Sequence, residues 1–156
     1  MLQLASMEFA TPKLVRLDFN DLKQFEQVSD RYRHLGVGFS GAIALQPSNP
    51  AFPNKSGSFV LMPMGNLMSL SAYFYKPIGW AGALVCSSRI VVLAAYDKEG
   101  NFLGQTSTIG KSSNLEDREE ESTSQQLQLN FPNIVKLEFY SCLPFTLDDF
   151  FFALLA

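Results

Sequence analysis

The clearest pattern in this chain is a strict alternation of apolar and polar side chains. It recurs in three segments, 14–19, 126–131 and 134–140. In the first of them, Val15, Leu17 and Phe19 share one side of an extended backbone, and polar residues take the other side. Because successive side chains of a strand point to opposite faces, this period of two predicts strands with one buried face.

Further strands follow from apolar runs that are bounded by turn residues. They are expected at 36–45, at 67–76 with Pro77 as its end, at 89–96, at 102–109 and at 145–154. The run at 89–96 is apolar on both faces, which predicts a central strand. The turn 97–101 carries Gly100, where a positive φ is needed, and joins two of these strands as a hairpin.

One segment conflicts with the extended pattern. Between Asn20 and Leu35 the apolar residues approach helical spacing, and Gly36 follows as a helix end. We expect only a short helical turn, around 30–35. The chain 1–156 is therefore predicted to be one all-β domain, a two-sheet antiparallel β-sandwich of the jelly-roll type, with 1–13 as a flexible N-terminal segment.

Two long polar segments interrupt the strands. The segment 46–58 contains three prolines and is expected to be a loop of the kind that carries function in sandwich domains. The segment 110–124 carries five acidic residues around Arg118 and is expected to be a solvated loop, because a run of charge does not by itself hold a ligand in place.

Composition narrows the range of partners. Hydrophobic residues make up 47% of the chain, with 14 Phe, whereas charged residues make up only 17% and the net charge is −3. Without a Lys/Arg patch, nucleic acid is not an expected partner. No apolar run is long enough for a transmembrane helix, and no signal peptide begins the chain, so it is expected to be cytoplasmic as given, or a mature form without its signal.

Catalytic and metal-binding motifs are not found. His34 is the only histidine, and neither a nucleophile elbow nor a phosphate loop is present. Cys86 and Cys142 have no metal or redox spacing. They are interpreted as buried thiols, with a disulfide as the alternative. We therefore expect a binding protein and no enzyme.

The order of several motifs resembles the galactose-binding-like jelly-roll domains that occur as carbohydrate-binding modules and as secreted bacterial domains. A hairpin, VVLAAYDKEGNFLG, is followed by a closing strand, FTLDDFFF, and this pair is the most telling. The other matching motifs are LDF at 17–19, YRHLGVGF at 32–39, AYFYKP at 72–77 and PNIVKLEFYS at 132–141.

This resemblance implies a structural calcium between the first and the last strand. Asp18 and Asp148 match the family's acidic positions, and Asp149 is a near alternative. Calcium prefers six to eight oxygen ligands, which loop carbonyls could complete. Since Asp148 and Asp149 are adjacent, they point to opposite faces of a strand, and only one of them can face a given site.

The resemblance also implies carbohydrate as the ligand, bound by exposed aromatic rings that stack on sugars. The candidates are Tyr73, Tyr75 and Trp80, with Arg89 or Asn66 as polar helpers. The alternative function is a protein-interaction or assembly domain, in which case a homo-oligomer is expected. The identity of the ligand does not follow from the sequence.

Overall fold

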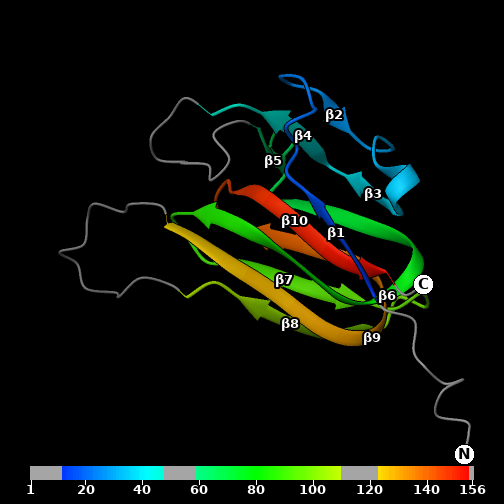
Figure 1. The fold of residues 1–156 in the computed structure, drawn as a ribbon. Coiled ribbons are helices and arrows are strands. Elements are labelled where there is room, and N and C mark those ends of the chain that lie inside the picture. Colours follow the sequence, from blue (N-terminus) through cyan, green and yellow to red (C-terminus); the bar gives the residue numbers. More distant parts are fainter. Residues whose placement is uncertain (1–11, 48–58, 110–122, 155–156) are drawn as a thin grey trace, which may run out of the picture.

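The structure is a computed structural model that describes residues 12–47, 59–109 and 123–154 (Figure 1). Within these residues, ten strands join into one antiparallel sheet, and one 3-10 turn accompanies them. The strands are β1 (Lys13–Leu17), β2 (Gln27–Val28), β3 (Val37–Ser40), β4 (Ala42–Leu45), β5 (Val60–Pro63), β6 (Ser69–Ser87), β7 (Val91–Tyr96), β8 (Phe102–Ser107), β9 (Thr123–Ser141) and β10 (Thr146–Leu154). The predicted all-β sandwich is confirmed.

Two long strands, β6 and β9, bend so that the single sheet folds into two layers. Residues 78–87 of β6 lie between β10 and the first part of β9, and with β1 they form the front layer of Figure 1. Residues 69–73 of β6 pair with β3 and with the end of β9, which continues to β7 and β8 as the rear layer. The two strands bend from one layer into the other at the same end of the molecule.

The bends correct two predicted strand ends. Pro77 was expected to end its strand, but β6 continues through it to Ser87. Pairing with β9 is irregular between Tyr73 and Ile78, so the missing N–H of proline removes no ladder bond there. Asn133 was expected to be a turn between two strands. It instead adopts a φ of 67° inside β9, which bends there without a break.

A third correction concerns 36–45, predicted as a single strand. Gly41 has a φ of 76°, a conformation that favours glycine, and it splits the segment into β3 and β4. The strand β3 pairs with β6, whereas β4 pairs with β2 and β5. Neither β2 nor β5 was predicted, because both are too short to show a period.

Aromatic rings fill the space between the layers. Val15, Leu17 and Phe19 are buried, as the alternation predicted. Phe150 of β10 is at the centre of the core, with ring centroids 5.2 Å from Phe39 and 6.2 Å from Phe74. Because these partners lie on strands of the rear layer, the contacts hold the two layers together.

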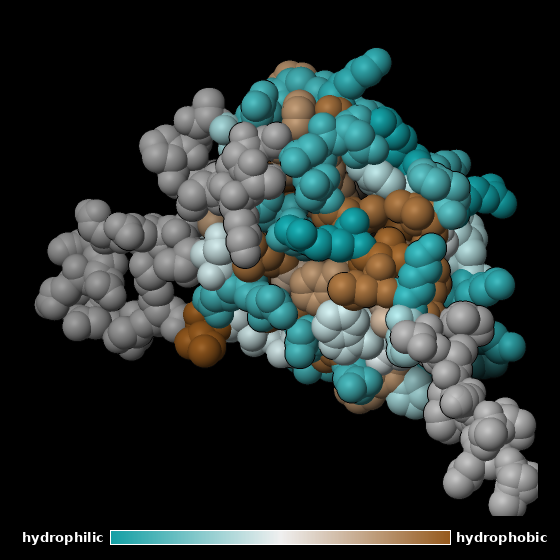
Figure 2. Space-filling view, viewed as in Figure 1, coloured by the Kyte–Doolittle hydropathy of each residue, from teal (hydrophilic) through white to brown (hydrophobic). Residues whose placement is uncertain are grey.

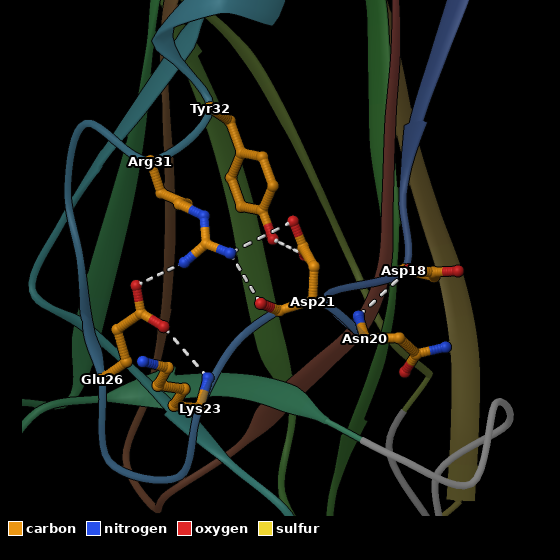
Figure 3. A network of polar contacts seen from close by, with 7 residues as sticks. All are labelled: Asp18, Asn20, Asp21, Lys23, Glu26, Arg31 and Tyr32. Atoms are coloured by element: carbon orange, nitrogen blue, oxygen red, sulfur yellow. Dashed lines mark hydrogen bonds and ion pairs between the residues drawn. The ribbon is translucent and has the colours of Figure 1, made fainter.

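A network of polar contacts orders the segment that precedes β3 (Figure 3). Arg31 forms ion pairs with Glu26 at 2.8 Å and with Asp21 at 3.5 Å. The buried Tyr32 donates a 2.6 Å hydrogen bond to the carboxylate of Asp21. The predicted helical turn is confirmed as the 3-10 turn η1 (Arg33–Leu35), which ends at Gly36 in the left-handed conformation.

The remaining predictions have mixed outcomes. The 97–101 hairpin is confirmed, since β7 and β8 pair across it. Cys86 is buried as expected, but Cys142 is exposed, and the two form no disulfide. The calls on 1–13, 46–58 and 110–124 fall largely outside the described residues. Within those residues, no helix has the length and apolar character needed to cross a membrane.

Candidate functional site

The outer face of the front layer carries an aromatic pair, which we call the tryptophan platform. Trp80 and Phe151 lie on neighbouring strands and stack with ring centroids 5.0 Å apart and an interplanar angle of 29°. Phe151 lies against Gly82 of β6, where a Cβ would meet its Cε1 at 2.7 Å. In Figure 2 hydrophobic surface occupies the middle of this face, over β1 and β10, with hydrophilic surface around it.

Polar groups border the platform. Arg16 pairs with Asp149 at 3.1 Å, and both lie on the same outer face as Phe151. Gln126 donates a hydrogen bond to Gln128 on the neighbouring part of β9. The second oxygen of Asp149, Oδ1, is buried and has no hydrogen-bond partner among the described residues. The platform thus combines a flat apolar centre with donors and acceptors at its margin.

The outer face of the rear layer carries a different aromatic arrangement. Tyr73 of β6, Lys136 of β9 and Tyr96 of β7 lie side by side in register. The ammonium group of Lys136 lies 5.7 Å from the ring centroid of Tyr73 and 5.6 Å from that of Tyr96. Such distances are favourable for cation–π contacts, which hold Lys136 between the two rings.

These residues line a hollow of about 430 Å³, which we call the tyrosine–lysine groove. Glu138 and Lys98 also line it. A second hollow of about 300 Å³ adjoins it and shares Asp97, Lys98 and Val135 with it, so that the groove continues toward Pro77 and Asn133. Together they reach the volume of small-ligand sites, for which a few hundred Å³ is the ordinary range.

Two ionisable groups of the groove have shifted pKa values. Partial burial, followed by the charge of Glu138, raises the pKa of Tyr96, which further favours the protonated hydroxyl, a hydrogen-bond donor. Asp97 accepts hydrogen bonds from the backbone N–H groups of Glu99 and Asn101, and these bonds lower its pKa. Asp97 therefore stays ionised, and its oxygens hold the turn in shape.

The structure separates the predicted binding residues. Tyr73 and Tyr75 share the outer face of the rear layer, with 39% and 51% of each residue exposed. Trp80 lies on the opposite outer face of the sandwich. By this point β6 has passed into the front layer, and its pairing is irregular between Ile78 and Trp80. Asn66 and Arg89 are exposed, but neither lines the groove.

The residues expected to bind calcium differ in their exposure to solvent. Asp18 is exposed and accepts a hydrogen bond from the backbone N–H of Asn20. Asp148 and Asp149 are both buried, since a register shift between Leu147 and Asp149 breaks the alternation there. Among the described residues, no three acidic, His or Cys side chains form a group that could hold a metal ion. Calcium stays a prediction, and it would compete with Arg16 for Asp149.

Sequence reasoning missed Lys136, Tyr96 and Glu138. A signal for two of them was present, since Lys136 and Glu138 are the polar, outward residues of the alternating segment 134–140. What the alternation does not reveal is the register, which places Lys136 beside Tyr73 on one side and Tyr96 on the other. That pairing links three segments that are far apart in the sequence.

Comparisons with known proteins give a fold and no close relative. No protein-family model matches the chain. No curated protein matches it either. Among solved structures, the K2 cleaved adhesin domain of Lys-gingipain (Kgp) is 11% identical, with a TM-score of 0.56 over 89% of this chain and 97% of that one. A mutant of a carbohydrate binding module family 29 is 11% identical, with a TM-score of 0.50 over 92% of each chain.

At this identity the likeness shows the fold alone. The fold is a β-sandwich of the type found in this adhesin domain and this carbohydrate binding module, as the resemblance in the sequence implied. Both proteins are covered over nearly their whole length, so the likeness extends to both layers. Since one fold can serve many functions, the function must be argued from the surfaces described above.

Proposed function

We propose that this domain binds carbohydrate without catalysis, and that the tyrosine–lysine groove is its binding site. The observation that carries the proposal is the row of Tyr73, Lys136 and Tyr96 across three paired strands. Neighbouring strands are about 4.8 Å apart, so the two tyrosines stand roughly 10 Å apart. That spacing lets two rings support different sugar units of one chain.

The chemistry of the groove suits a saccharide. Tyr73 offers a partly exposed ring on which the apolar face of a pyranose can stack. Lys136 and the hydroxyl of Tyr96 are donors for sugar hydroxyl groups, and Glu138 is an acceptor. Opposite charges are balanced, with Lys98 and Lys136 against Asp97 and Glu138, which favours a neutral ligand. The fold, shared with a carbohydrate binding module, supports the same conclusion.

The groove carries carboxylates, but we assign it no glycosidase activity. Such an enzyme uses two carboxyl groups, one of which must be protonated to act as an acid. The carboxylates lining the described groove are Asp97 and Glu138, and Glu99 lines the adjoining hollow. Asp97 is held by the backbone of its own turn, and its pKa is lowered. It is therefore unsuited to be the acid of such a pair, and the proposal assigns it a structural role in the turn.

A protein-interaction function is the second candidate, and the exposed edge of the rear layer favours it. Phe102 begins β8, the last strand of the sheet, and is 55% exposed. An edge strand with an exposed aromatic residue can pair with another chain. Light scattering at several concentrations tests this candidate: a stable oligomer that Phe102→Ala dissolves would support it.

Carbohydrate binding is tested on a glycan array, followed by calorimetry with the neutral oligosaccharide that binds best. Tyr73→Ala is expected to weaken binding about tenfold, or about 1.4 kcal/mol, because the stacking surface is lost. Tyr73→Phe retains the ring and is expected to bind nearly as the parent does. Absence of binding to every glycan on the array would overturn the proposal.

The single tryptophan identifies the face that is used. Trp80 lies in the front layer, so a ligand in the groove should leave its fluorescence unchanged. Trp80→Ala serves as the matched aromatic control and is expected to bind as the parent does. If Trp80→Ala abolishes binding and Tyr73→Ala does not, the site is the tryptophan platform and the groove is wrong.

A further inference from the structure

A third hollow, of about 310 Å³, lies at the end of the sandwich where the two layers meet. The front layer contributes the ends of β1 and β10, which pair there as Lys13 with Leu154. The rear layer contributes Gly36, which precedes β3, and the adjacent part of β6 around Tyr75. A backbone hydrogen bond of 3.1 Å from Tyr75 to Gly36 joins these two segments. We call this hollow the basic pocket.

Its lining is charged with one sign. The cations Lys13, Arg33 and Lys76 line the pocket together with His34, and no acidic residue is among the described residues that line it. All four are exposed, whereas the ion pairs found within 12–47, 59–109 and 123–154 are made by Arg16 and Arg31. Such a concentration of positive charge is unusual in a chain whose net charge is −3.

The rest of the lining is apolar and aromatic. Val15, Leu35 and Leu154 form apolar wall, and the absence of a side chain at Gly36 leaves room beside Leu154. Tyr75 stands at the side with half of its surface exposed. The guanidinium group of Arg33 lies 5.1 Å from the centre of the Tyr75 ring, which orients this cation at the pocket.

We propose that the basic pocket binds a small organic anion: one carboxylate, phosphate or sulfate group on a body about the size of a single sugar or aromatic ring. The cations provide charge-assisted hydrogen bonds, and a guanidinium can hold two oxygens of such a group at once. The apolar wall and Tyr75 receive the body of the ligand. The volume is at the lower end of the range for small-molecule sites, which restricts the ligand to about one ring.

This site is separate from the proposed carbohydrate site in residues and in chemistry. The groove lining has charges of both signs, whereas the described lining of the basic pocket has only positive ones. No residue is shared between the two linings. The anion site therefore does not depend on whether the groove binds neutral glycans.

The experiment titrates the whole chain with three probes that share one ring size, observed by NMR or calorimetry. The probes are D-glucuronate, D-glucose 6-phosphate and D-glucose. We expect one or both anionic probes to bind with an affinity that falls as salt is added, and no binding of glucose at the same concentrations. The two anionic arms show whether carboxylate or phosphate is preferred.

Variants locate the site. Arg33→Gln and Lys76→Gln are each expected to weaken anion binding about tenfold through loss of a charge-assisted contact. Lys23→Gln removes an exposed cation outside the pocket and is expected to change nothing. All three positions are exposed, and unchanged circular dichroism and melting would show that the variants fold.

Three results would overturn the proposal: no binding of either anion, equal binding of glucose that Tyr73→Ala does not remove, or an equal loss in Lys23→Gln. Tyr73→Ala separates this outcome from that of the carbohydrate site. It should leave anion binding intact even when it abolishes binding of a neutral glycan. Loss of both activities in Tyr73→Ala would show that the anion occupies the groove, and the basic pocket would then be wrong.

Discussion

Phe150 offers the most direct test of how the two layers are held together. It is fully buried, and its ring is within 5.2–6.5 Å of four others, on β3, β6, β9 and β10. Phe150→Ala removes the ring from the centre of this cluster. A buried Phe→Ala substitution costs about 3–5 kcal/mol, and we expect a value near the upper end because rings on two layers lose contact at once. Phe150→Leu keeps most of the volume and should cost about 1.5 kcal/mol.

The assay is urea unfolding followed by circular dichroism and fluorescence. A loss of about 4 kcal/mol is a large part of the 5–15 kcal/mol that stabilise most domains, so the midpoint should fall steeply while the slope stays the same. Phe102→Ala, on the exposed edge strand, is the matched control and should cost less than about 1 kcal/mol. If Phe150→Ala costs no more than Phe102→Ala, the two layers do not pack on this ring and the described core is wrong.

Two further predictions concern the close packing of the front layer and the loop network. Gly82→Ala should destabilise the protein by about 3 kcal/mol or more, because the new Cβ would lie 2.9 Å from the Cα of Gln128 and against the carbonyl of Leu127, and backbone atoms cannot move aside as a side chain can. Gly79→Ala is the control, because the space around Gly79 is open. Equal melting temperatures of the two variants would contradict the argument. Burial and the hydrogen bond to Asp21 raise the pKa of Tyr32 above its ordinary value of 10.0, so the folded state keeps a proton that the unfolded state loses, and stability should fall as pH rises above about 10. In Tyr32→Phe, the urea midpoint measured from pH 8 to 11 should fall less steeply with pH than in the parent. An equally steep fall of the midpoint in both proteins would refute this assignment.

The fold class could be predicted because it depends on a local property. A period of two needs only the order of neighbouring residues, and it placed Val15, Leu17 and Phe19 in the core correctly. The ends of the strands were harder to predict. Pro77 and Asn133 have the chemistry of turns, yet both lie within bent strands, because the layers of this sandwich share β6 and β9. Whether such a residue ends a strand or bends it depends on the neighbouring strands, which the local sequence does not specify.

The candidate sites show the same limit on a larger scale. Tyr73 and Trp80 are seven positions apart, and the sequence alone suggests one aromatic surface. The irregular pairing of Ile78 places them on opposite outer faces. Conversely, Lys13 and Lys76 are far apart in sequence and form no visible patch with Arg33, but pairing of β1 with β10 and of β3 with β6 brings all three to one pocket.

Charge balance over the whole chain is therefore a poor guide to what this domain binds. The net charge of −3 and the scattered cations argued against a nucleic-acid partner. However, a ligand responds to charges within about a Debye length, roughly 8 Å at physiological ionic strength, and much less to the sum over the chain. The described lining of the basic pocket presents Arg33, Lys13 and Lys76 without an acidic residue. The groove, with charges of both signs, presents a nearly neutral surface. Two sites on one sandwich can thus select opposite kinds of ligand, and the difference arises from strand register, because register decides which distant side chains become neighbours.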